Sequence, residues 1–200
     1  MPKIVDHSER RAELSAVAAQ VIAARGLEAA TIREIAQASG YSKGVVEHYF
    51  DDKEQLISAA LDSANHRYEV RATKATAGLQ GLAALRQRIL ATLPMTSAER
   101  DEWKVRLVFW SLAAIQPQLR QRQRRRFGRA IMSFEQDIKV AVQAGELSVG
   151  SDTQVQARRI VNMTTGISAA ALHNPGFYSR ALLTAEADYL ITQIKRESPV

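Results

Sequence analysis

The stretch TIREIAQASGYSKGVVEHYFDDK, residues 31–53, decides how the first quarter of this chain folds. Thr31 is a typical helix N-cap, and Glu34, three residues later, completes the sequence pattern of a capping box. Gly40 stands where a helix needs a left-handed residue to end, and Ser42 can then cap a second helix. The stretch therefore predicts two short helices that are joined by a tight turn.

The second of these helices, expected at residues 43–49, has an outward polar face. Val46 and Phe50 are four residues apart, so both side chains point inward toward the core. The other side chains are left outside: Lys43, Val45, Glu47, His48 and Tyr49. A short helix that is braced by another, with polar and small residues outward, is the pattern of a DNA-reading helix-turn-helix.

The rest of the chain predicts helices only. The 200 residues include just 10 glycines and 5 prolines, and alternating Val/Ile runs are missing, so the fold class is all-α. Caps, apolar periodicity and the positions of glycine and proline predict nine helices. Their expected ranges are 8–25, 32–39, 43–49, 53–76, 82–93, 97–115, 117–144, 153–172 and 178–196, with a loop at 146–151 and Asp152 as the cap of the eighth helix.

Composition narrows the class of protein further. Cysteine is absent, so disulfides and thiolate chemistry are excluded. The N-terminus MPKIVDHSERR is polar and lacks the apolar segment of a signal peptide. No apolar run approaches the roughly 18 residues of a membrane span. We therefore expect a cytoplasmic protein without a membrane partner.

Catalytic and metal-binding patterns are not found. The four histidines are scattered, and neither a Gly-x-Ser-x-Gly motif nor a phosphate-binding glycine loop occurs. Asp101 and Glu102 are adjacent, so they point to different sides of a helix and are expected to be capping or surface groups. We predict that the chain is not an enzyme and has no catalytic residues, bound metal or cofactor.

The net charge of +6 does not come from the helix-turn-helix region. Residues 1–53 hold seven Lys/Arg and eight Asp/Glu, a net charge of −1, whereas the block 120–129 holds six arginines and no acid. The prediction of DNA binding therefore rests on the motif. Three interpretations of the arginine block stay open: a solvated helix with salt bridges, a wall that binds an anion or a carboxylate, and a second nucleic-acid or partner surface. The six arginines are Arg120, Arg122, Arg124, Arg125, Arg126 and Arg129.

The pattern T-I-x-x-I-A-x-x-[SA]-G-Y-S-x-G-V-V-x-H-Y-F-x-D-K-E-x-L-I resembles the DNA-binding signature of the TetR family of transcriptional regulators. Its Gly-Val-Val-x-His-Tyr-Phe segment is similar to the BetI-like, choline-responsive branch. The resemblance implies a helix-turn-helix DNA-binding domain at residues 1–53, below called the head. Residues 54–200, below called the body, would form a ligand-binding and dimerisation domain.

The resemblance also implies roles for residues of the head. Lys43 and Val45 would face base edges, since lysine can donate to guanine and an apolar side chain can meet a thymine methyl group. Gly44 would let the backbone approach DNA closely, and Thr31 and Lys53 would hold phosphates at helix starts. The full set of expected DNA contacts is Thr31, Ser42, Lys43, Gly44, Val45, Glu47, His48, Tyr49 and Lys53. The alternative is that the head is a folding unit without DNA affinity.

Two further surfaces are expected in the body. A ligand cavity between its middle helices would be lined by Trp103, Phe109, Trp110, Phe127, Phe134 and Met163; ordinary bundle core is the alternative. The last two helices would form the dimer face through Ile160, Thr164, Ile167, Ala171, Leu183, Ala187, Leu190 and Ile194; an intrachain core is the alternative.

The predicted function is that of a ligand-responsive repressor. Two copies would bind double-stranded DNA at a palindromic operator, since one reading helix is too short to specify a site. An unidentified small molecule would release the operator. The alternatives are a constitutive DNA-binding dimer without an inducer, and a helical small-molecule-binding protein or enzyme whose head does not read DNA.

Overall fold

The computed structural model describes residues 7–148 and 152–196 as nine α-helices without a strand. The helices are α1 (His7–Arg25), α2 (Ile32–Ser39), α3 (Lys43–Tyr49), α4 (Lys53–Thr76), α5 (Gly81–Thr92), α6 (Ser97–Ile115), α7 (Pro117–Gln143), α8 (Thr153–His173) and α9 (Arg180–Arg196). The all-α prediction is confirmed, and every predicted helix boundary lies within two residues of the observed one. The first six residues of the polar N-terminus and the end of the predicted loop at 146–151 lie outside the described residues.

The caps explain why the helix ends were predictable. Ser42 Oγ accepts a hydrogen bond from the Val45 amide at 3.3 Å, and Asp52 Oδ1 accepts one from the Gln55 amide at 2.7 Å. Gly40 ends α2 with a φ of 75°, a left-handed conformation that favours glycine. These local contacts need no tertiary packing, so sequence alone can indicate them.

The predicted capping box at Thr31 is only half formed. Thr31 Oγ1 accepts from the Glu34 amide at 3.1 Å, but the Glu34 carboxylate pairs with Arg25 at 2.5 Å. The Thr31 amide donates to the Ala29 carbonyl instead, at 2.9 Å. An arginine at the end of α1 therefore draws the glutamate away from the box.

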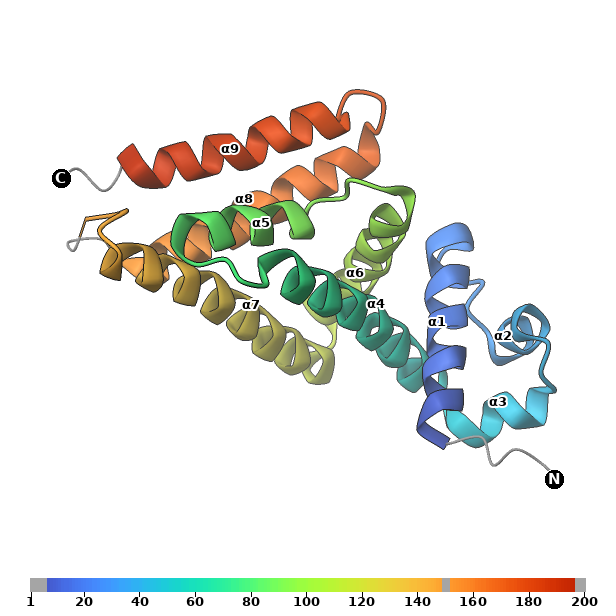
Figure 1. Cartoon of the computed structure of the whole chain (residues 1–200). Coiled ribbons are helices and arrows are strands. Elements are labelled where there is room, and N and C mark those ends of the chain that lie inside the picture. The colour runs from blue at the N-terminus through green and yellow to red at the C-terminus, as the bar shows by residue number, and fades with distance from the viewer. Residues whose placement is uncertain (1–6, 149–151, 197–200) are drawn as a thin grey trace.

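Figure 1 shows α1, α2 and α3 gathered at one end of the molecule, with α4 running from them into the body. The buried core of the head continues into the body, because Phe50 and Val46 belong to one cluster with Leu56 and Leu61 of α4 and Phe109 of α6. A second buried cluster joins α5, α7, α8 and α9. The division at residue 53 stays a prediction, and α4 is the covalent link across it.

The apolar stripe of α8 and α9 faces this second cluster and not the outside. Burial inside one chain accounts for seven of the eight residues predicted to form the dimer face, and the eighth, Ile167, is partly buried against the same cluster. The seven are Ile160, Thr164, Ala171, Leu183, Ala187, Leu190 and Ile194. That prediction needs correction, because side chains closed inside one chain cannot contact a second. A partner would have to contact other faces of these helices.

Among residues 7–148 and 152–196, no helix has the length and apolarity needed to cross a lipid bilayer.

Candidate functional site

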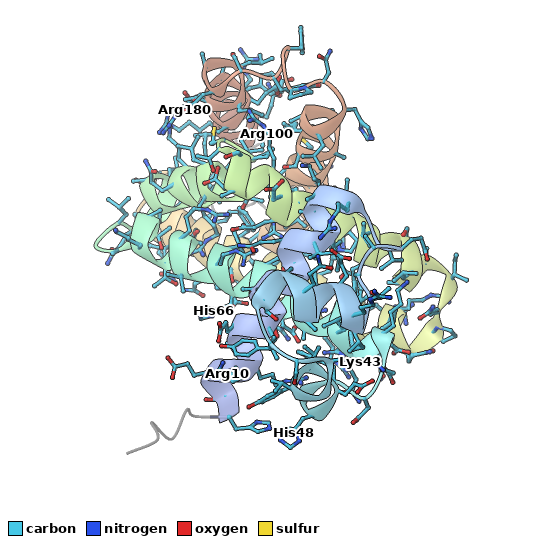
Figure 2. The ribbon with its side chains drawn as sticks, turned by 90° about the vertical axis from the view of Figure 1, so that its right-hand side faces the viewer. Arg10, Lys43, His48, His66, Arg100 and Arg180 are labelled. Carbon is cyan, nitrogen blue, oxygen red and sulfur yellow. The ribbon has the colours of Figure 1, made fainter. Side chains whose placement is uncertain are left out.

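The outer face of α3 is the first candidate site. Lys43, Gly44, Glu47 and His48 are exposed, whereas Val46 is fully buried in the core of the head. Figure 2 shows Lys43 and His48 at the end of the molecule that the head forms. The buried valine fixes the rotation of α3, so the polar side chains are held outward.

Lys43 is paired within its own helix. Its Nζ lies 2.8 Å from the Glu47 carboxylate, one helical turn away, with 66% of the lysine side chain and 50% of the glutamate side chain exposed. An exposed pair of this kind contributes about 0–1 kcal/mol to stability. A base edge or phosphate can therefore take Lys43 from Glu47 at little cost.

Among the residues that the structure describes, none packs closely enough against Gly44 to require a glycine there. A Cβ placed on Gly44 would meet no atom within 4 Å beyond its own helical neighbours. Gly44 is the second residue of α3, and glycine lowers helix stability relative to alanine, by roughly 0.5–1 kcal/mol in a helix interior. Its presence on the outer face of α3 fits a surface where another molecule comes close to the backbone.

The remaining predicted DNA contacts lie around α3. Lys53, at the start of α4, sits 3.4 Å from the exposed Glu28 carboxylate, and Thr31 is exposed at the start of α2. The ring of Tyr49 is half-buried, 5.2 Å from the ring of His48 and 4.5 Å from that of His7 in α1. His48 therefore faces outward, and Tyr49 also packs against α1.

Arg11 holds the end of α3 against α1, and sequence reasoning did not identify this role. Its Nη1 donates to the Tyr49 carbonyl at 2.6 Å, and its guanidinium lies 4.7 Å from the centre of the Phe50 ring. A C-terminal carbonyl of a short helix is a favourable partner for a cation. Arg11 thus positions the reading helix without belonging to its outer face.

The second candidate site is a cavity of about 100 Å³ in the body, enough for several water molecules or a small organic group. Its wall is formed by α4, α5, α6, α7 and α8. Of the predicted pocket residues, Trp103, Trp110, Phe127 and Phe134 line it. Neighbouring rings are in contact, with Trp110 5.7 Å from Trp103 and 5.5 Å from Phe127 between ring centres.

Two predicted pocket residues lie elsewhere. Phe109 is fully buried in the first core cluster, which joins the head to α4 and α6. Met163 lies on the outer side of α8 with 42% of its surface exposed. Phe109 and Trp110 are neighbours in sequence, but successive side chains on a helix point about 100° apart. Phe109 therefore packs in the first core cluster, while Trp110 lines the cavity.

Glu102 lies beside this cavity as a buried carboxylate, and the prediction that it is a capping or surface group is wrong. It is 2% exposed and lies 3.3 Å from Arg67, 2.9 Å from Arg71 and 3.7 Å from Arg106. Burial lowers the pKa of Arg106 to about 10, against the opposing effect of Glu102, which raises it. Arg106 is therefore charged at neutral pH, although it is buried.

The six arginines of the block in α7 point to different sides of the helix and have different partners. Arg120 donates to the carbonyl of Ala114 at 2.8 Å, at the end of α6. Arg122 and Arg126 pair with Asp62 of α4, and Arg126 also lines the cavity. The other three, Arg124, Arg125 and Arg129, are exposed. Arg126 is thus the one described member of the block that lines the cavity, while Arg120 and Arg122 contact neighbouring helices and the other three face outward.

An exposed helix-turn-helix at one end and a body of six described helices with a cavity among them are the arrangement of a DNA-binding regulator. Residues 14–60 match the family model described as bacterial regulatory proteins, tetR family. Residues 81–194, more than half of the chain, match the model described as BetI-type transcriptional repressor, C-terminal. The chain belongs to the TetR family, with a BetI-type body. The family is one of transcriptional regulators and not of enzymes.

Relatives and solved structures agree with this assignment. The HTH-type transcriptional regulator BetI of Burkholderia mallei is 32% identical over 126 residues, which span 62% of this chain and 65% of that protein. A transcriptional regulator from Rhodococcus sp. Rha1 matches with a TM-score of 0.82 at 25% identity, covering 95% of this chain and 98% of the other. A regulator from Saccharomonospora viridis, in complex with choline, has a TM-score of 0.79 at 21% identity over 92% and 96% of the two chains; this last likeness shows the fold alone.

Proposed function

We propose that this chain is a homodimeric repressor that reads a palindromic operator with two copies of α3 and releases it when a small molecule binds the cavity. The observation that carries the proposal is the position of Leu61 on α4. Leu61 belongs to the buried cluster of the head and also lines the cavity. One rigid helix thus connects the ligand compartment to the DNA-reading surface.

The coupling acts through α4. Asn65 and Tyr68 lie one and two turns beyond Leu61 and line the cavity, while Leu56, earlier on the same helix, is buried in the head. A ligand that prefers one orientation of α4 shifts the positions of both heads. It must bind the released state better than the DNA-bound state, and a tenfold loss of operator affinity needs a preference of about 1.4 kcal/mol.

The dimer surface is proposed on the outer faces of α8 and α9. Met163 and Tyr189 are 42% and 50% exposed there, so both can contact a second chain. Gly166 lies one turn after Met163, and a Cβ placed on it would meet nothing within 4 Å. Among the described residues nothing fills the space beside Gly166, so a helix of a second chain has room to come close to the α8 backbone there.

Gly166→Arg is expected to convert the protein from dimer to monomer, because the long charged side chain would separate the two α8 helices. Sedimentation velocity at micromolar concentration measures the mass directly. Gly128→Arg is the matched control, since Gly128 in α7 is equally open. A Gly166→Arg protein that stays dimeric, or a control that dissociates equally, would place the interface elsewhere.

A gel shift with DNA from upstream of the protein's own gene tests the proposed function. We expect a shifted band without additions and its loss with at least one fraction of small metabolites. Absence of any shift would overturn the proposal. A shift that every fraction leaves unchanged would indicate a constitutive DNA-binding dimer.

A further inference from the structure

Four buried polar atoms without a hydrogen-bond partner in the described chain gather at one place. They are Asn65 Nδ2, Arg106 Nη2, Gln123 Oε1 and Arg126 Nη1, and all four residues line the cavity of the body. Leaving a buried polar group unpaired costs about 1–3 kcal/mol, more if it is charged. Three of the four atoms are nitrogen donors. A molecule that came within hydrogen-bond distance of these four atoms would meet mainly donors.

The wall of the cavity is also positively charged. It contains the guanidinium groups of Arg106 and Arg126, and no aspartate or glutamate is among its lining residues. The carboxylate nearest to Arg106 is that of Glu102, which is shared with two further arginines. Arg126 pairs with Asp62, whose side chain is 56% exposed on the outer side of α4. Glu102 is shared by three arginines and Asp62 by Arg122 and Arg126, so each of these acids has more than one arginine to neutralise.

Two of the aromatic rings that line the cavity, those of Tyr68 and Trp103, already face an arginine. The Arg106 guanidinium lies 5.0 Å from the Trp103 ring centre and 5.3 Å from that of Tyr68. The Arg126 guanidinium lies 5.4 Å from the ring centre of Phe109. A cationic ligand needs such faces for itself, and here it would also lie beside two like charges. The site therefore disfavours a quaternary ammonium group such as that of choline.

We propose that the cavity binds a small organic anion with a carboxylate group and an apolar body. The carboxylate accepts hydrogen bonds from Arg106 Nη2 and Arg126 Nη1, neither of which donates a hydrogen bond within the described chain, since guanidinium groups match carboxylate geometry. The apolar part packs against Trp110, Phe127 and Phe134. This inference deepens the proposed function and rests on the cavity being the ligand site of that function.

Isothermal titration calorimetry of the full chain with three probes of similar size tests whether the cavity prefers a negatively charged, a neutral or a positively charged ligand. The probes are 3-phenylpropionate, its neutral amide and 3-phenylpropylamine, and choline is added as a fourth. We expect the acid to bind at least tenfold more tightly than the amide, and the two cations to give no measurable binding. Equal or tighter binding of either cation overturns the proposal, and so does the absence of binding by phenylpropionate, phenylacetate and benzoate at millimolar concentration.

Variants locate the binding site. Arg106→Gln and Arg126→Gln are each expected to raise the dissociation constant of the acid about tenfold or more, since a hydrogen bond to a charged group is lost. Arg124→Gln, two residues from Arg126 but exposed, is the control and should bind like the unmodified chain. Circular dichroism verifies folding. Unchanged affinity in both test variants, with folding intact, would overturn the assignment.

The titration is independent of DNA, so failure of this inference and failure of the proposed function are distinguishable. If the acid binds through the two arginines but leaves the gel shift unchanged, the anion site stands and its role in release fails. If the operator binds and a metabolite releases it while no anion enters the cavity, the repressor proposal stands and the anion inference is wrong.

Discussion

Lys43→Ala is expected to raise the dissociation constant for a symmetric operator about 30-fold or more. Loss of one base contact costs about 1–3 kcal/mol, and the dimer presents Lys43 twice. The exposed pair with Glu47 stabilises the free protein little, so its loss does not offset the lost contact. Fluorescence anisotropy at fixed salt concentration measures the change.

Lys139→Ala is the matched control for this prediction. Lys139 is also exposed and also pairs with a glutamate one turn away, at 2.7 Å, but it lies on α7 in the body. Its removal changes the net charge by the same amount and should leave operator affinity nearly unchanged. Equal effects of the two substitutions would mean that Lys43 acts through net charge and reads no base.

Glu102→Gln is expected to lower the free energy of unfolding by about 3–5 kcal/mol, because it leaves the buried Arg106 without a charged partner. Glutamine has nearly the same shape as glutamate, so the fall in the free energy of unfolding is due to the lost charge and not to a change in volume. The burial that lowers the pKa of Arg106 to about 10 already disfavours its charge, and the substitution removes the opposing carboxylate. Urea denaturation followed by circular dichroism measures the change.

Asp101→Asn, one residue earlier, serves as the control for this second prediction. Asp101 pairs with Lys104 at 2.8 Å, but both side chains are about half exposed. Its loss should cost no more than about 1 kcal/mol. If Glu102→Gln were as mild as Asp101→Asn, the arginine cluster around Glu102 would not depend on that charge.

The helices were predictable because their boundaries depend on local chemistry. The hydroxyl of Ser42, the carboxylate of Asp52 and the glycine at 40 act within one turn of their own backbone. The reading face of α3 follows from the same local pattern, since Val46 and Phe50 fix which side is buried. Which exposed side chains touch DNA stays a prediction.

The body was less predictable, because periodicity shows which residues share a face and not what covers that face. The spacing of Leu183 and Ala187 fits a dimer face and an intrachain core equally well. In the structure α9 packs against α5, and both residues belong to the intrachain core. The arginine block shows the same limit. Arg124 and Arg126 are two residues apart, yet one is exposed and the other lines the cavity.

Glu34 and Glu102 were both misjudged for one physical reason. A cation distant in sequence or on another helix competes for the carboxylate: Arg25 for Glu34, and Arg71 for Glu102. Such pairs form only after the helices meet. A chain with 27 Lys/Arg residues offers many partners of this kind, so a distant arginine overrides the local rule at these two glutamates.

Selection of bound duplexes from a random pool, followed by sedimentation of the protein with the selected duplex, tests the central claim most directly. The account predicts a consensus of two inverted half-sites about one helical turn or a multiple apart, occupied by two chains per duplex. A pool that shows no enrichment, or an asymmetric consensus occupied by one chain, would contradict it.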